Sequence, residues 1–223
     1  MYFSEWEPVY VKILNDMGID RSSDETSARS LKLLTINSDI ISEDDISGII
    51  KNEVIVAGGN VSSDDMILLK ELRPGRTLIS AGSAADVLMM NDIVPDIAVT
   101  DLDGDAELQK KASASGSVLV VHAHGDNLHL IKEHVKDIKT PIMITTQSRP
   151  DITLCNFGGF TDGDRAVCMA RHFGAKKITL IGFKFDEPAY KPDTDMVMKK
   201  RKLRWAERII FEMNPDDVEI IQL

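Results

Sequence analysis

Ile97-Ala98-Val99-Thr100-Asp101-Leu102-Asp103-Gly104-Asp105 changes within a few residues from apolar to strongly acidic. Its apolar start is typical of a buried strand, and its aspartates are typical of the loop that follows. In an α/β sheet, the loops beyond the carboxyl ends of the strands hold the functional residues. We therefore expect an α/β fold whose site includes this acidic loop.

The acidic loop favours a hard divalent cation. In an extended segment Asp101 and Asp103 would share one face, and carboxylates that close repel each other unless a cation or a proton lies between them. One or two carboxylates, completed by waters and substrate phosphates, are the ligand set of Mg²⁺ rather than of Zn²⁺. The sequence thus predicts a Mg²⁺ site with Asp101, Asp103 and Asp105 as candidate ligands, and a solvated loop is the structural alternative.

Two known acidic motifs match this loop incompletely. An EF-hand requires Gly where Ala106 stands and Glu where Ala112 stands. Haloacid-dehalogenase-like phosphatases share the Asp-x-Asp-Gly pattern, but they follow the Gly with Thr or Val and carry the motif on their first strand. Here Asp105 follows the Gly, and several expected strands precede the motif. Because of these two differences, a phosphatase is kept only as an alternative.

Short β-rich runs alternate with helical patterns from residue 54 onward. This alternation predicts parallel βαβ units in a doubly wound, mostly parallel sheet that is covered on both faces. Residues 1–50 show helical spacing, with a helix start at Ser42. We expect an N-terminal helical extension over 1–50 and one α/β domain over 51–223. The expected strands are 54–56, 77–79, 97–99, 118–121, 142–145, 152–154, 178–181 and 218–221.

The composition narrows the class of partner. The chain has 223 residues and a formal net charge of -10, which argues against binding to nucleic acid or to an anionic membrane. No apolar stretch approaches the ~20 residues that span a bilayer, and the N-terminus lacks the order of a signal peptide. We therefore expect a cytoplasmic protein with a small-molecule partner, and a homo-oligomeric state is left open. Cys155 and Cys168 lack metal-ligand spacing and are expected to be buried thiols.

Two further stretches could serve phosphate or substrate binding. The turn Ala57-Gly58-Gly59-Asn60-Val61-Ser62-Ser63 offers backbone amides, although an ordinary strand-to-helix turn explains it equally well. In His122-Ala123-His124-Gly125-Asp126-Asn127 the two histidines would share one face. A zinc hydrolase motif would need His where Asn127 stands, so we favour hydrogen bonding to phosphate or substrate, with a structural role as the alternative.

The last candidate stretches are glycine-rich and basic. Asn156-Phe157-Gly158-Gly159-Phe160-Thr161-Asp162-Gly163-Asp164-Arg165-Ala166 leads into a helical pattern whose N-terminus would present free amides. Gly158, Gly159 and Arg165 favour phosphate recognition, whereas Asp162 or Asp164 could simply cap the helix. Lys199 and Lys202 lie one helical turn apart within a basic run, so both could reach a polyphosphate. A solvated helix face is the alternative for that run.

These motifs together resemble a known family. Thr100–Asp105, His122–Asn127, Asn156–Ala166 and the terminal Lys199/Lys202-Leu203 are similar, in this order, to motifs of the archaeal 6-hydroxymethyl-7,8-dihydropterin pyrophosphokinases, the MptE-like family. That family is related in fold to the catalytic domain of thiamin pyrophosphokinase. The resemblance covers most of the chain and implies transfer of diphosphate from ATP to a reduced pterin, with Mg²⁺ as cofactor, in folate or tetrahydromethanopterin biosynthesis.

The resemblance also implies roles for individual residues. Asp101 and Asp103 match the Gly-Asp-x-Asp-Ser motif of thiamin pyrophosphokinases, and Thr161, Asp162, Arg165 and Ala166 match their Thr-Asp-x-x-Lys-Ala motif, with Arg for Lys. Asp101, Asp103 and Asp162 would hold one or two Mg²⁺ ions. Phosphate, nucleotide or acceptor contacts would come from His122, His124, Asn127, Gly158, Gly159, Thr161, Asp164, Arg165, Lys199 and Lys202, while Asp105 and Asp126 complete the polar site.

Two departures from the related patterns leave alternatives open. Gly82 stands where thiamin pyrophosphokinases carry an Asp after an early strand, and Gly58–Ser62 differs from the Gly-x-Gly-Pro-Ser usual in the pterin family. A contact to metal or nucleotide is therefore missing or supplied elsewhere. Thiamin pyrophosphokinase, an Asp-x-Asp-Gly-type phosphatase and a non-catalytic nucleotide-binding module stay as alternatives.

Overall fold

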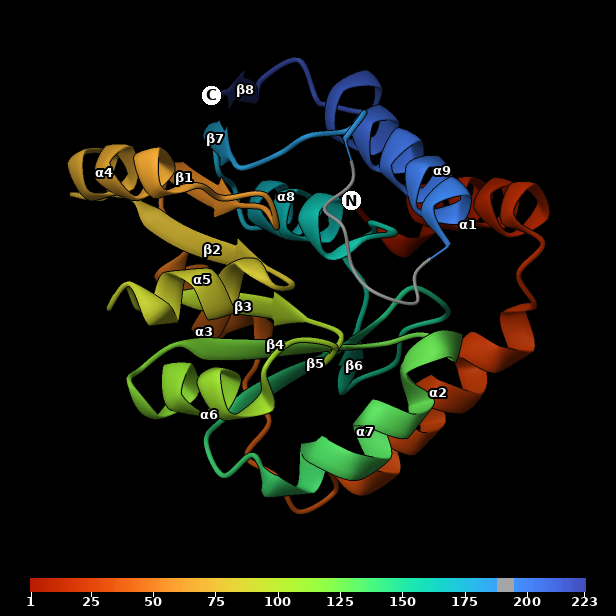
Figure 1. Ribbon diagram of the computed structural model, residues 1–223. Coiled ribbons are helices and arrows are strands. Elements are labelled where there is room, and N and C mark those ends of the chain that lie inside the picture. The colour runs from red at the N-terminus through yellow and green to blue at the C-terminus, as the bar shows by residue number, and fades with distance from the viewer. Residues whose placement is uncertain (188–194) are drawn as a thin grey trace.

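A single parallel sheet organises the chain (Figure 1). The computed structural model describes residues 1–187 and 195–223, and within them the sheet has eight strands in the order β6-β5-β4-β3-β2-β1-β7-β8. Every neighbouring pair is parallel. The strands are β1 (Glu53–Ala57), β2 (Thr77–Ala81), β3 (Ile97–Thr100), β4 (Val118–Ala123), β5 (Ile142–Thr146), β6 (Leu154–Cys155), β7 (Lys177–Ile181) and β8 (Glu219–Gln222).

Helices cover both faces of this sheet. Alternate strand residues point to opposite faces, so Val54 and Val56 pack with helix α8, whereas Ile55 packs with helices α4 and α5. Helices α2 and α7 cover β4 and β5 on the α4 side. The helices are α1 (Phe3–Met17), α2 (Arg21–Leu34), α3 (Glu43–Ile49), α4 (Ser63–Leu72), α5 (Ala84–Met90), α6 (Ala106–Ala114), α7 (Leu128–His134), α8 (Asp162–His172) and α9 (Met196–Glu207), with short helical turns at Gly125–Asn127, Val135–Asp137 and Arg208–Glu212. The predicted doubly wound α/β architecture is confirmed.

The N-terminal helices pack against the rest of the fold. Trp6 and Tyr10 of α1 are fully buried in a cluster that also contains Trp205 of α9 and Cys168 of α8, while α2 lies beside α7 along β4 and β5. The helix start at Ser42 is confirmed, since its hydroxyl accepts a hydrogen bond from the Asp45 amide at 3.3 Å. The division at residue 50 stays a prediction. None of the helices described is long and apolar enough to cross a membrane.

Two local expectations are wrong. The strand expected at 152–154 begins only at Leu154, because the Asp151 carboxylate accepts hydrogen bonds from the amides of Thr153 and Leu154 and holds this segment in a turn. Ile152 is fully exposed as a result. Cys168 is buried as expected, but Cys155 is only half-buried, since β6 is an edge strand.

Candidate active site

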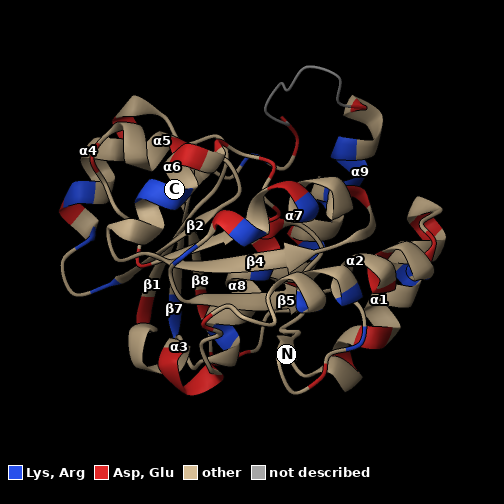
Figure 2. Ribbon diagram, turned by 90° about the horizontal axis from the view of Figure 1, so that it is seen from below, with Lys and Arg blue, Asp and Glu red and all other residues tan. Residues whose placement is uncertain are grey.

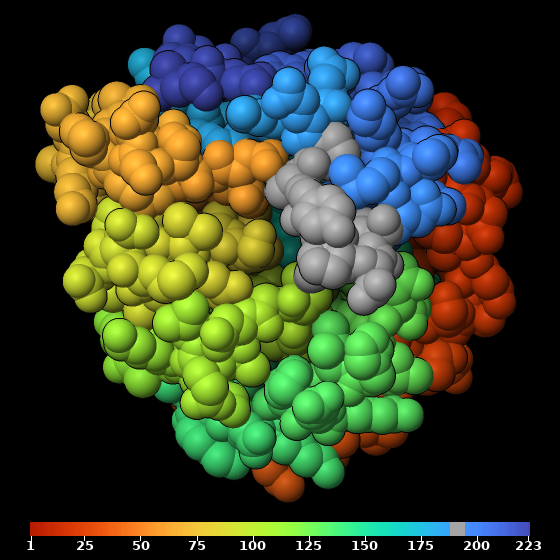
Figure 3. Space-filling model, viewed as in Figure 1, coloured from red at the N-terminus to blue at the C-terminus, as the bar shows by residue number. Residues whose placement is uncertain are grey.

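A cavity of about 790 Å³ opens at the carboxyl ends of β5, β4, β3, β2, β1 and β7. Its size is that of a small-molecule site. Figure 3 shows the segments that carry the strand-end loops, coloured from orange to green, and the blue helix α9 gathered around the middle of this face. Every strand that borders the cavity contributes the loop that follows it, as the sequence predicts for an α/β sheet. The loops contribute Gln147, His124, Gly125, Asp126, Asp101, Asp103, Gly104, Asp105, Gly82, Ser83, Gly58, Gly59, Asn60 and Gly182–Phe185.

The acidic loop after β3 is held in a tight local conformation. The Thr100 hydroxyl accepts the Leu102 amide at 2.9 Å, and Asp101 Oδ1 accepts the Asp103 amide at 3.1 Å. Leu102 takes a left-handed φ of 67° while its side chain is buried, a strained conformation typical of functional loops. Asp101 and Asp103 both line the cavity, although a turn at Leu102 places them there rather than the extended segment that we expected.

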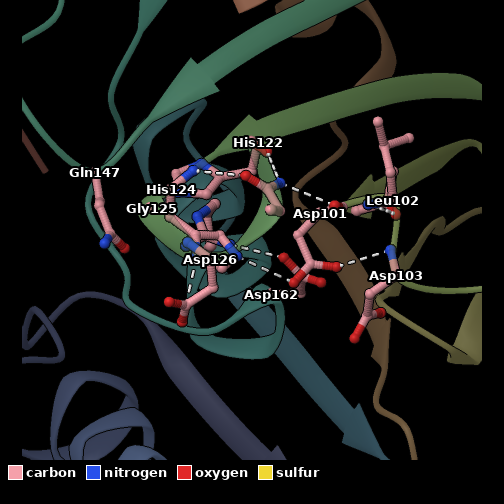
Figure 4. Close-up of polar contacts among 12 residues, drawn as sticks. Asp101, Leu102, Asp103, His122, His124, Gly125, Asp126, Gln147 and Asp162 are labelled. Carbon is pink, nitrogen blue, oxygen red and sulfur yellow. Dashed lines mark hydrogen bonds and ion pairs between the residues drawn. The ribbon is translucent and has the colours of Figure 1, made fainter. Parts of the chain in front are cut away.

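Asp101 is the best-supported carboxylate of the cluster (Figure 4). His124 Nε2 lies 3.3 Å from Asp101 Oδ2. Burial opposes the ionised form of Asp101, but the hydrogen bond and the charge of His124 outweigh it and hold the pKa of Asp101 below its usual range. Asp101 is therefore ionised at neutral pH, and its contact with His124 fixes the orientation of its side chain.

Asp162 joins the cluster from the start of α8. Burial raises the pKa of Asp162 well above its usual value, and the charges of Asp101 and Asp103 raise it further, while Arg165 opposes the shift. Arg165 Nη1 lies 2.7 Å from Asp162 Oδ1, and both side chains are largely buried. Asp162 thus lies near two other acids, and such a grouping of carboxylates is the condition that a bound cation relieves.

The donor set fits a hard divalent cation. Among the side chains of residues 1–187 and 195–223, no three of His, Cys, Asp or Glu converge closely enough to form a complete set of metal ligands. A Mg²⁺ ion does not require one, because it commonly uses one or two carboxylates and completes its shell with waters and phosphates. Asp101, Asp103 and Asp162, which all line the cavity, would provide the carboxylate oxygens for such an ion.

Several predicted residues lie behind the cavity wall. Asp164 accepts hydrogen bonds from the amides of Phe160 (2.6 Å) and Thr161 (2.8 Å), so it caps helix α8. Asn127 donates to the carbonyls of Asp101 (2.8 Å) and His122 (2.7 Å) and thereby ties the ends of β3 and β4 together. His122 is fully buried, and burial lowers its pKa well below the usual value, so it is neutral. Gly158 and Gly159 likewise do not contribute to the cavity lining, whereas Thr161 and Arg165 do.

Basic side chains form the opposite wall. Lys199, Lys202 and Lys184 line the cavity from α9 and from the loop after β7. Lys202 Nζ lies 3.5 Å from Asp126 Oδ2 and 5.9 Å from the centre of the Phe160 ring. In Figure 2 the ribbon of α9 is blue where Lys and Arg lie, whereas that of α3 is red with acidic residues, so the basic wall is a local exception in an acidic protein. Lysines opposite a carboxylate cluster suit a ligand that carries both phosphates and a metal ion.

The cavity also contains residues that the sequence motifs did not indicate. Gly82 leaves room for Asp162, because a Cβ at position 82 would lie 3.1 Å from Asp162 Oδ2. Asp86, in the first turn of α5, lines the cavity instead, and its Oδ2 accepts the Asp105 amide at 2.9 Å. Asp24 of α2 and Gln147 after β5 line the cavity at the end formed by β4 and β5. Their only sequence signal is a polar side chain next to buried residues.

An acidic cluster, a lysine wall and glycine turns at the carboxyl edge of a parallel sheet define an α/β protein of the class that binds phosphorylated ligands. The family model of the "6-hydroxymethylpterin diphosphokinase MptE-like" proteins matches residues 33–189. The chain belongs to this family. It is an enzyme of the diphosphotransferase class.

Three archaeal relatives are similar over nearly their whole length, and each is named 6-hydroxymethyl-7,8-dihydropterin pyrophosphokinase. The protein of Methanothermobacter thermautotrophicus is 38% identical over 222 residues, with 95% of each chain covered. That of Methanocaldococcus jannaschii is 37% identical over 238 residues (99% of this chain, 98% of the relative). That of Pyrococcus furiosus is 34% identical over 220 residues (94% and 93%).

A solved structure with a similar fold is the MAf glycosyltransferase of Magnetospirillum magneticum AMB-1. The match has a TM-score of 0.53 and 17% sequence identity, and it covers 91% of this chain but 38% of the glycosyltransferase. At this identity the likeness concerns the fold alone.

Proposed function

We propose that the protein transfers diphosphate from ATP to the hydroxymethyl group of 6-hydroxymethyl-7,8-dihydropterin and releases AMP, with Mg²⁺ as cofactor. The observation that carries the proposal is that Asp101, Asp103 and Asp162 line one cavity together with Lys199 and Lys202. The names of the three archaeal relatives support the pterin as acceptor.

In this reaction the acceptor hydroxyl oxygen bonds to the β-phosphorus while the bond from that phosphorus to the oxygen bridging it to the α-phosphorus breaks. The electron pair of the broken bond leaves with AMP. A bound Mg²⁺ would neutralise phosphate charge, as in other phosphoryl transfers. Asp101 and Asp103 would hold the ion, with Asp162 as a further carboxylate ligand. Lys199, Lys202 and Arg165 would contact the phosphates.

Asp126 is our candidate to orient the acceptor hydroxyl and to take up its proton. Its side chain is 77% exposed and lies 3.9 Å from His124 Nδ1. His124 lies between Asp126 and the acidic cluster, because it also contacts Asp101. Because positioning and electrostatics supply most of the acceleration in phosphoryl transfer, no covalent nucleophile is required.

The test incubates the purified protein with ATP and Mg²⁺ and, in parallel, with 6-hydroxymethyl-7,8-dihydropterin or thiamin. Chromatography then separates AMP, ADP and inorganic phosphate. AMP formed in step with pterin diphosphate is the expected result, and the Asp101→Asn variant should lose at least about 100-fold in turnover while remaining folded. AMP formed only with thiamin would change the acceptor, and free phosphate would favour the phosphatase. ATP binding without AMP release would favour a non-catalytic module.

A further inference from the structure

The cavity has two chemically different ends. The strands lie in the order β5-β4-β3-β2-β1-β7. The acidic loop after β3 therefore lies between the two ends of the cavity. Beyond it on one side are the glycine turns after β1, β2 and β7, where backbone can approach a ligand closely. On the other side are the loops after β4 and β5, with helix α2 against them. Asp24, Gly125 and Gln147 line this second end.

Asp24 is a buried carboxylate at the second end. Its side chain is 1% exposed, and its oxygens accept hydrogen bonds from the Tyr10 hydroxyl (2.5 Å), Gln147 Nε2 (2.7 Å) and the Gly125 amide (2.7 Å). In the described part of the chain no Lys, Arg or His forms an ion pair with it. Burying a carboxylate without a counter-charge is costly, and three donors leave one of its roughly four lone-pair positions unused. Such a group is suited to a ligand that brings donors of its own.

The surroundings hold Asp24 and Gln147 in fixed positions. Trp6 Nε1 donates to the Gln147 carbonyl at 2.8 Å, which fixes the backbone of the loop after β5. Gly125 allows the turn after β4 to approach α2, because a Cβ there would overlap the Ser23 side chain. The polar groups at this end are therefore preorganised by α1, α2 and two strand-end loops, and this arrangement is typical of a specificity site.

We propose that Asp24 and Gln147 bind the aminopyrimidinone edge of the pterin acceptor, with the nucleotide at the glycine-turn end of the cavity. This inference rests on the proposed function. The 2-amino group and the neighbouring ring N–H of a pterin are adjacent donors, which a carboxylate and an amide oxygen accept. A pterin held in this way places its hydroxymethyl group toward Asp101, His124 and Asp126, between the two ends.

The test measures acceptor binding by titration calorimetry in the presence of Mg²⁺ and α,β-methylene-ATP, which binds without transfer. The two probes are 6-hydroxymethyl-7,8-dihydropterin and its 2-oxo analogue, which lacks the amino group. The wild-type protein should prefer the pterin by at least about tenfold. Asp24→Asn should weaken pterin binding by a similar factor and lose the preference, while its affinity for the nucleotide analogue changes less than twofold.

Three further variants separate recognition from structure. Tyr10→Phe removes one hydrogen bond to Asp24 outside the cavity, so it should lower thermal stability and keep the preference. Asp44→Asn, an exposed acid on α3, controls for the change of net charge. Gln147→Leu should lose pterin affinity as Asp24→Asn does, and it supplies the readout where Asp24→Asn does not fold.

The outcomes separate this inference from the proposed function. A wild-type protein that binds the pterin and releases AMP, with variants at 24 and 147 that retain the preference, would overturn the inference alone. Loss of nucleotide affinity rather than pterin affinity in Asp24→Asn would reverse the two ends of the cavity and also overturn it. A wild-type protein that binds neither acceptor would overturn the proposed function and the inference together.

Discussion

Asp162 shows a conflict between folding and chemistry at the scale of a single residue. Burial, followed by the charge of Asp101, raises its pKa well above the usual value, so the folded protein holds this proton more tightly than the unfolded chain does. For a raised pKa, stability falls as the pH rises from the unfolded pKa, about 3.9, through the folded pKa, and the full cost is present above it. A functional acid that lowers stability in this way is common at active sites.

Asp162→Asn should therefore stabilise the protein without ligands at pH 8. Each kcal/mol gained raises the Tm by roughly 2–4 °C in a chain of this size, and the advantage should shrink as the pH falls and vanish below about pH 3, where Asp162 is protonated in both states. Differential scanning calorimetry across this pH range measures the effect, with Asp44→Asn as control. A variant that is less stable than the wild-type protein at pH 8 would show that the Arg165 ion pair outweighs the repulsion.

Local sequence indicated some site residues and missed others for a physical reason. Asp101 and Asp103 follow a buried strand directly, so their position at the sheet edge could be predicted from the chain alone. Asp24 and Gln147 reach the cavity only because α2 packs beside the turn after β4 and β5 runs next to β4. No spacing along the chain encodes that contact. In the same way, Asp164, which caps α8, and Asp162, which lines the cavity, lie two residues apart in one motif, and only the start of α8 separates their positions.

At the scale of elements, the glycine-rich approach to α8 depends on one close backbone contact. Gly159 has a φ of 92°, and a Cβ there would lie 2.6 Å from the Arg165 backbone nitrogen. Gly174, after the same helix, has a φ of 89° but nothing within 4 Å of a Cβ. Substitutions at these two glycines therefore distinguish the cost of a left-handed backbone from the cost of steric overlap.

Gly174→Ala should cost about 1 kcal/mol of unfolding free energy from strain alone, whereas Gly159→Ala should cost roughly 2–4 kcal/mol because Arg165 and the start of α8 must shift. Urea denaturation gives both values. Gly159→Ala should also reduce turnover, since Arg165 positions Asp162. Equal losses of stability in the two variants would mean that the chain before α8 adjusts freely.

Helix α9 carries lysines on a face that borders the cavity and on a face that does not. Lys202 lines the cavity, whereas Lys200 is exposed and outside the cavity lining. A phosphate contact from a charged donor is worth about 1.5–3 kcal/mol, so Lys202→Ala should lower kcat/KM for ATP by roughly 10- to 100-fold. Lys200→Ala, with the same change of charge, should stay within twofold in steady-state kinetics. A comparable loss in both variants would assign the effect to the general field of the helix.

Strands were the most predictable elements. The runs that form the inner strands are buried between two helical layers, because a parallel sheet covered on both faces requires such residues at every position. The run at 152–154 was the exception, since its apolar Ile152 lies in a turn that Asp151 fixes. A three-residue run at a sheet edge carries too little pattern to compete with an aspartate turn.

Across the whole molecule, ligands should stabilise the fold through the cavity that the sheet edge and α9 enclose. The chain carries a formal net charge of -10, and several of its acids face this cavity, so a nucleotide alone should be repelled and a nucleotide with Mg²⁺ should be bound. A ligand at 100 times its Kd adds about 2.7 kcal/mol of stability, which corresponds to a Tm increase of roughly 5–11 °C. We expect this increase with Mg²⁺ and α,β-methylene-ATP, and only a small one with the nucleotide and EDTA.

Asp101→Asn should lose the Mg²⁺-dependent part of the increase while its Tm without ligands stays close to that of the wild-type protein. An equal increase with and without Mg²⁺ would mean that the lysine wall alone binds the triphosphate and that the acidic loop serves another role.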